Sequence, residues 1–250
     1  MIRISAISYL NSVPFVYGLH HSGLAREADI ALDHPAECAR KLLDGQADLG
    51  LVPVAVLPRI ANARVLPGFC IGADGPVRTV SLLGQCPVER MERIYLDYQS
   101  RTSVQLLRML CAERWSVAPS WEQLTPQHDI TAFDGADGVL VIGDRVFGVE
   151  QRYAHSYDLA HEWQQLTGRP FVFAVWAARG PLNPEFEQRF GAALALGLQH
   201  IEQAVAERYP KGLLANEQAV HYLRHNISFD LDAHKRMAME LFISKLNHKY

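Results

Sequence analysis

Short apolar segments alternate with helix-like segments over the first third of the chain, and this alternation restricts the folds that the chain can adopt. Residues 3–7 and 29–32 have the composition of strands, and residues 35–43 that of a helix that begins with proline. Residues 48–54 are mostly apolar, which is typical of a buried strand in a parallel sheet. The order β-α-β-α-β with right-handed crossovers therefore predicts an α/β protein with a doubly wound sheet.

The same alternation continues beyond residue 70. We expect further strands at residues 77–83, 94–97, 138–144 and 171–176. The last third is helical. A long helix begins at Pro184 and keeps one apolar face as far as Val205, and two more helices follow at about residues 216–225 and 231–246.

Two breaks in this pattern divide the chain. The strand at 77–83 leads into a turn, and the strand at 171–176 leads into a Gly-Pro pair. Such breaks are typical of a second lobe that is inserted into a first, with a hinged ligand cleft between them. We expect one lobe from residues 1–84 and 178–250 and another from residues 85–177. Periodicity alone is equally compatible with a single sheet.

Composition excludes several classes of function. The 250 residues are 49% apolar and 20% charged with a net charge of −3, so there is no basic excess to bind a phosphate backbone, and we expect no nucleic-acid partner. No run of about 18 apolar residues predicts a membrane span, and residues 1–6 do not begin a signal peptide. The four cysteines form no C-x-x-C pair, which favours reduced thiols and a cytoplasmic location.

The usual cofactor and nucleophile motifs are absent from the sequence. It contains no G-x-G-x-x-G, no G-x-x-x-x-G-K-[ST] and no G-x-S-x-G. His221 and His225 lie four residues apart, one turn after Glu217, but a solvated helix face explains them better than a metal site. We therefore expect neither a metal nor a cofactor.

Polar residues follow the first strand and precede a helix. Ser8, Tyr9, Asn11 and Ser12 lie at the carboxyl end of that strand, where ligands bind in doubly wound folds. The Asn11 amide and the N–H groups of the helix start could bind an anion or a carbonyl group. The competing interpretation is that Asn11 or Ser12 caps the helix.

A richer cluster follows the strand at 94–97. Ser100, Arg101, Thr102 and Ser103 supply three hydroxyls and a guanidinium at a helix N-terminus, a combination that could bind a carboxylate. A simple helix cap with a solvated Arg101 is an equally good interpretation.

Two turns complete the candidates. Pro76 and Val77 precede a strand, in either an ordinary turn or a cleft edge that carries Thr79 as a hydroxyl donor. Gly143 and Asp144 end another strand, where glycine lets a ligand approach the backbone and Asp144 alternatively caps the next helix.

These segments, taken in order, resemble the MqnA/MqnD family of menaquinone biosynthesis, which acts in the futalosine pathway. The matching segments are Ile7-Ser8-Tyr9-Leu10-Asn11, Gly50-Leu51-Val52-Pro53, Gly75-Pro76-Val77, Leu96-Asp97 with Ser100-Arg101-Thr102-Ser103, Ile142-Gly143-Asp144 and Pro170-Phe171-Val172-Phe173-Ala174. The resemblance extends from about residue 3 to residue 180, and the Tyr-Leu-Asn opening is most like the chorismate dehydratase branch. It implies a two-lobed fold like that of type II periplasmic binding proteins, with a ligand cleft between the lobes.

The resemblance also implies an activity: a hydro-lyase that converts chorismate to 3-[(1-carboxyvinyl)oxy]benzoate and water. It implies that Asn11 and Thr79 act near the reacting carbons, although the family pattern has Ser where this chain has Thr79. The implied base is the enolpyruvyl carboxylate of the substrate, or else Asp144. The implied substrate-binding residues are Ser8, Tyr9, Pro53, Pro76, Val77, Ser100, Arg101, Thr102, Gly143 and Asp144.

Two other functions stay open at this point. The chain could belong to the sister branch, which acts on cyclic dehypoxanthine futalosine. It could also be a non-enzymatic protein that binds a small carboxylate in the same cleft.

Overall fold

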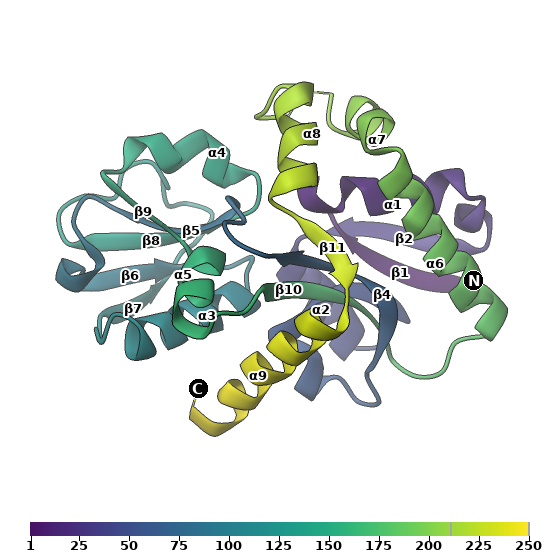
Figure 1. The fold of residues 1–250 in the computed structure, drawn as a ribbon, viewed down its shortest axis with the longest axis horizontal. Helices are drawn as coiled ribbons and strands as arrows, with labels where there is room; N and C mark the ends of the chain where they lie inside the picture. Colours follow the sequence, from purple (N-terminus) through teal and green to yellow (C-terminus); the bar gives the residue numbers. More distant parts are fainter. Residues whose placement is uncertain (211, 250) are drawn as a thin grey trace.

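The strands form two separate sheets, one in each half of the molecule, in a computed structural model that describes residues 1–210 and 212–249 (Figure 1). The first sheet has the order β11-β4-β10-β3-β1-β2. Its strands are β1 (Ile2–Ile7), β2 (Ala28–Asp33), β3 (Leu49–Pro53), β4 (Arg64–Ala73), β10 (Phe171–Ala178) and β11 (Ser228–Leu231). The second has the order β7-β6-β8-β5-β9. Its strands are β5 (Val80–Gly84), β6 (Arg93–Leu96), β7 (Ser120–Gln123), β8 (Asp137–Ile142) and β9 (His155–Asp158).

Helices cover both sheets, and the last three lie toward the first sheet (Figure 1). They are α1 (Val13–His21), α2 (Pro35–Leu43), α3 (Thr102–Glu113), α4 (Arg145–Val149), α5 (Leu159–Thr167), α6 (Pro184–Gln199), α7 (Ile201–Arg208), α8 (Asn216–His225) and α9 (Ala233–Lys249). Two short 3₁₀ segments, η1 (Leu10–Ser12) and η3 (Val54–Arg59), follow β1 and β3. No helix in the described ranges combines the length and the apolar composition that crossing a membrane requires.

The parallel sheet predicted from the sequence is present in one part of the first sheet. β1 pairs in parallel with β2 and with β3, as expected. β10 pairs antiparallel with β3 and with β4, so the complete sheet is mixed. The sequence analysis did not predict β4, because Pro67 and Gly68 interrupt it and half of its length is partly exposed.

The strand pairings place the connections between the sheets differently from the predicted boundaries at residues 84 and 178. β5, assigned to the first lobe, pairs in the second sheet, and β10, assigned to the second lobe, pairs in the first. The break after β5 is a turn within the second sheet, and the Gly-Pro pair after β10 leads to α6. The pairings favour connections at 74–79 and 168–170. The division of the chain into two folding domains stays a prediction.

The long helix expected between Pro184 and Val205 is divided into α6 and α7 at His200. Both helices pack against α1, and buried apolar positions continue across the break, so periodicity does not locate it. Gly18 and Gly197 bring α1 and α6 unusually close: a Cβ on Gly197 would lie 1.8 Å from the carbonyl oxygen of Pro14.

One apolar core runs through both sheets, and a smaller cluster in the second sheet includes Val139, Val146 and Tyr153. All four cysteines are unpaired.

Candidate functional site

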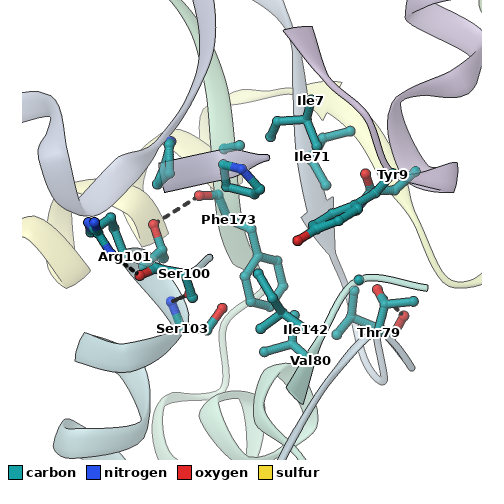
Figure 2. A pocket seen from close by; sticks show the side chains of 17 residues that line it. Ile7, Tyr9, Ile71, Thr79, Val80, Ser100, Arg101, Ser103, Ile142 and Phe173 are labelled. Carbon is teal, nitrogen blue, oxygen red and sulfur yellow. Dashed lines mark hydrogen bonds between the residues drawn. The ribbon is translucent and has the colours of Figure 1, made fainter. Parts of the chain in front are cut away.

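A cavity with about 470 Å³ of empty space, part of it open to solvent, lies between the two sheets (Figure 2). Its lining comes from the loop after β1, the end of β3, the segment before β5, the N-terminus of α3, the end of β8 and the middle of β10. The lining residues are Ile7, Tyr9, Asn11, Pro35, Pro53, Ile71, Val77, Thr79, Val80, Ser100, Arg101, Thr102, Ser103, Ile142, Gly143, Phe173 and Ala174. Both sheets contribute, so the cavity lies between the two lobes.

Most of the residues proposed from the sequence meet at this cavity. The predicted residues that line it are Tyr9, Asn11, Pro53, Val77, Thr79, Ser100, Arg101, Thr102 and Gly143. Ser8, Pro76 and Asp144 do not line it. Sequence reasoning missed Phe173 as a site residue, because an apolar strand shows no sign of which side chain faces a cavity.

The polar groups at one end of the cavity centre on Asn11. Neither Asn11 nor Ser12 caps α1 with its side chain, so the capping interpretation is wrong here. The Oδ1 atom of Asn11 is buried and has no hydrogen-bond partner among the described residues. Thr79, buried beside it, is hydrogen-bonded through Oγ1 to the phenol of Tyr222 at 2.8 Å. This end of the cavity therefore presents a free acceptor next to a hydroxyl.

Tyr222 is a residue that the sequence analysis missed. It comes from α8, where Ala219, Tyr222 and Leu223 form the buried face. Burial raises the pKa of its phenol, and interactions with Thr79 and Asn11 oppose that rise. A tyrosine on the apolar face of a helix needs a buried partner for its hydroxyl, and this requirement is the one signal that could have identified it.

The ring of Tyr9 lies against Gly143 across the cleft. A Cβ on Gly143 would lie 2.8 Å from that ring, and the φ of Gly143 is +70°. The Tyr9 hydroxyl donates to the Oε1 atom of Gln99 in the other lobe. Burial, together with the negative charge of Asp97, raises the pKa of Tyr9. Tyr9 is therefore a proton donor near neutral pH and not a base.

The opposite end of the cavity is the N-terminus of α3. The Oγ of Ser100 accepts from the amide of Ser103 at 3.1 Å. The Thr102 hydroxyl donates to the carbonyl oxygen of Phe173 at 3.1 Å and accepts from the amide of Ala55 at 3.2 Å, so it joins the lobes. Figure 2 shows the Ser103 hydroxyl turned toward the ring of Phe173. Ser103 therefore has the hydroxyl better placed for a ligand.

Arg101 lies at the edge of the cavity. Its side chain is exposed and donates to the carbonyl oxygens of Tyr98 at 3.2 Å and Ser100 at 2.9 Å. In Figure 2 its guanidinium lies on the side of the cavity away from Tyr9. A carboxylate bound at the α3 N-terminus would have to draw this side chain inward.

Asp144 makes a contact that the sequence did not suggest. Its side chain does not cap α4 and does not line the cavity. Its carboxylate accepts from the amide of Leu10, in the other lobe, at 3.1 and 3.2 Å. Burial raises its pKa to about 6, and the bond from Leu10 opposes that rise.

The other two predicted residues lie outside the cavity. Ser8 is exposed and lines a separate pocket, which Tyr9 also borders. Pro76 is exposed, and its carbonyl oxygen accepts from the Asn226 amide at 3.0 Å.

Ordinary acid–base groups are absent from the described lining, which contains no Asp, Glu, His or Lys side chain. Asp97 is a fully buried carboxylate that accepts from the amides of Gln99 at 3.0 Å and Ile142 at 3.1 Å and from Arg145 at 2.5 Å. Among the residues whose placement is described, no group of three or more His, Cys, Asp or Glu side chains could hold a metal ion.

Comparison with known proteins gives the chain a family and a fold. The model of a menaquinone biosynthesis family matches residues 2–248. A chorismate dehydratase from Thermus thermophilus is 28% identical over 95% of this chain and 92% of its own length. A crystal structure of a protein from Archaeoglobus fulgidus superposes with a TM-score of 0.73 at 14% identity, over 98% of this chain and 96% of that one.

The periplasmic aliphatic sulphonate binding protein of Escherichia coli superposes with a TM-score of 0.61 at 16% identity, over 100% of this chain and 94% of that one. The two-lobed fold is therefore that of the periplasmic binding proteins, as the sequence analysis expected. The family model covers nearly the whole sequence, and the chain therefore belongs to the menaquinone biosynthesis family.

Proposed function

We propose that this protein is a chorismate dehydratase, which removes water from chorismate to give 3-[(1-carboxyvinyl)oxy]benzoate. The observation that carries the proposal is the arrangement of the cavity. A free acceptor and a hydroxyl lie at one end, and hydroxyls, an arginine and a helix N-terminus lie at the other. Apolar side chains, with the ring of Phe173, separate the two ends. This arrangement suits a ring compound with a hydroxyl on one side and a carboxylate on the other.

The chemistry proposed for these groups is mostly orientation and electrostatic support. Ser100, Ser103 and Arg101 would bind one carboxylate at the α3 N-terminus. The Oδ1 of Asn11 would accept from the ring hydroxyl at C4, and Thr79 would donate to that oxygen as it leaves. Loss of the C3 proton and of the C4 hydroxide gives one molecule of water and an aromatic ring.

The proton from C3 needs an acceptor. The described lining offers no carboxylate, imidazole or amine, Tyr9 is kept protonated, and the carboxylate of Asp144 is engaged with Leu10. These observations support the enolpyruvyl carboxylate of the substrate as the base, in a substrate-assisted elimination.

The test is to incubate the purified protein with chorismate and to follow the aromatic product by absorbance and mass. In Asn11→Ala we expect kcat/KM to fall by about 100-fold, a typical cost of removing one group that polarises the reacting atoms. Asn216→Ala, an exposed site at the start of α8, is the matched control and should keep wild-type turnover. Wild-type rates in Asn11→Ala would remove the loop after β1 from the mechanism.

The same experiment separates the alternatives. A protein that binds chorismate without forming product would be a binding protein for small carboxylates. A protein that leaves chorismate unchanged and consumes cyclic dehypoxanthine futalosine would belong to the sister branch.

A further inference from the structure

Tyr222 lies behind the polar end of the cavity and contacts both residues proposed to act on the ring. Its side chain is fully buried, and its ring packs edge-on against Phe147 with centroids 5.2 Å apart. Its hydroxyl is hydrogen-bonded to Thr79 at 2.8 Å, and its phenol interacts with the side chain of Asn11. Because α8 follows β10 and α7 in the chain, a C-terminal helix supports two groups of the N-terminal half.

The interaction between Tyr222 and Asn11 bears on which end of the Asn11 amide faces the cavity. A carboxamide has a donor end and an acceptor end of nearly equal shape, and either can be turned toward a ligand. The Oδ1 atom of Asn11 has no partner among the described residues, so the Nδ2 end of the amide is the one available to interact with Tyr222. The acceptor end is therefore left for the ligand, and a hydroxyl donor on that ligand would satisfy it.

We propose that Tyr222 is a positioning residue that fixes the Asn11 amide with its oxygen toward the cavity and holds the Thr79 hydroxyl beside it. The kinetic test of this inference rests on the proposed function, because it measures turnover of chorismate. It assigns to Tyr222 no contact with the substrate. Loss of the phenol oxygen would free the amide to rotate and would leave Thr79 without its 2.8 Å partner.

The test compares two buried tyrosines. Tyr222→Phe keeps the ring and removes the hydroxyl. Tyr153→Phe is the matched control, because the Tyr153 hydroxyl donates to the carbonyl oxygen of Ile130 at 2.6 Å in the small core cluster of the second sheet. Both variants should lose similar thermal stability. Only Tyr222→Phe should lose activity, by about tenfold in kcat with a smaller change in KM. A kcat within about twofold of wild type would overturn the proposal.

A double-mutant cycle shows whether Tyr222 acts through Asn11. We expect Tyr222→Phe to lower kcat/KM by about tenfold in the wild-type protein and by a clearly smaller factor in Asn11→Ala, where only its effect through Thr79 is left. Equal factors in both backgrounds would show that Tyr222 does not act through Asn11.

The proposed function and this inference fail separately. A wild-type protein that does not convert chorismate overturns the function. The position of the Asn11 amide can then be tested by a measurement that does not need enzymatic activity. This measurement is the NMR spectrum of the side-chain NH₂ groups in protein labelled with ¹⁵N-asparagine. We expect Tyr222→Phe to shift those signals, and unchanged signals would overturn the role of Tyr222.

Discussion

Gly143 is a position at which one methyl group would change the shape of the cavity. Its φ of +70° strains any other residue, and an added Cβ would lie 2.8–2.9 Å from the ring of Tyr9. We expect Gly143→Ala to displace that ring and its bond to Gln99, to cost about 2 kcal/mol of stability and to lower kcat/KM by at least about tenfold. Urea denaturation and turnover of chorismate measure the two effects.

Gly168 provides the control for backbone strain alone. Its φ is +67°, close to that of Gly143, but an added Cβ would meet no atom within 4 Å. Gly168→Ala should therefore lose about 1 kcal/mol and keep its activity. If both variants lose activity equally, contact with Tyr9 is not the reason.

Single residues also show how far sequence reasoning reaches at the site. Strand ends followed by hydroxyls and an amide located Asn11 and the α3 N-terminus, because ligands bind at the carboxyl ends of strands, and a turn that enters a strand located Thr79. The sequence did not reveal which hydroxyls are free. Thr102 bonds to a carbonyl 71 residues away, whereas the neighbouring Ser103 faces the cavity. Such partners depend on tertiary contacts that no local pattern contains.

At the scale of elements, the η1 turn is held by a carboxyl group from the opposite lobe. The Asp144 carboxyl accepts from the amide of Leu10, and burial raises its pKa from 3.8 to about 6. Because the folded state holds this proton more tightly than the unfolded state, the contribution of Asp144 to stability falls as the pH rises from about 4 to about 6. The full difference corresponds to at most about 3 kcal/mol.

Asp144→Asn should remove this dependence, since an amide oxygen can still accept from Leu10 without a buried charge. We expect the variant to be more stable than wild type at pH 7.5 and about equally stable at pH 4, in urea denaturation at both values. Burial also raises the pKa of Asp158. Because Asp158 is present in both proteins, its effect cancels from the comparison. A variant that is less stable at pH 7.5 would show that the charge itself strengthens the turn.

The elements predicted best are those with local signals. α2 and α8 have the predicted bounds, and α2 begins with His34 as a cap before Pro35. β4 is interrupted by Pro67 and Gly68 and is held mainly by β10, more than 90 residues later, so its sequence shows neither alternation nor a continuous apolar run. The type of an element was therefore predictable where helix caps and hydrophobic periodicity agree. It was not predictable where pairing with a distant strand determines the structure.

At the scale of the whole molecule, hydrogen bonds between the lobes close the cleft. Gln99 receives two of them: its Oε1 from Tyr9 and its carbonyl oxygen from the amide of Ala36 at 3.0 Å. Thr102 joins Phe173 and Ala55 to α3. Because these contacts join the two lobes that line the cavity, we expect a more open form, in exchange with this one, to admit the ligand.

Tyr9→Phe tests this exchange, because the ring still packs on Gly143 while the bond to Gln99 is lost. One lost hydrogen bond of about 1 kcal/mol shifts the balance toward the open form by about fivefold. We expect small-angle scattering to give a larger radius of gyration for the free variant than for free wild type, and equal values with saturating ligand. Tyr98→Phe is the control, since its hydroxyl accepts from the Gln99 amide within one lobe. Equal scattering from both free variants would mean that the Tyr9 bond does not hold the lobes together.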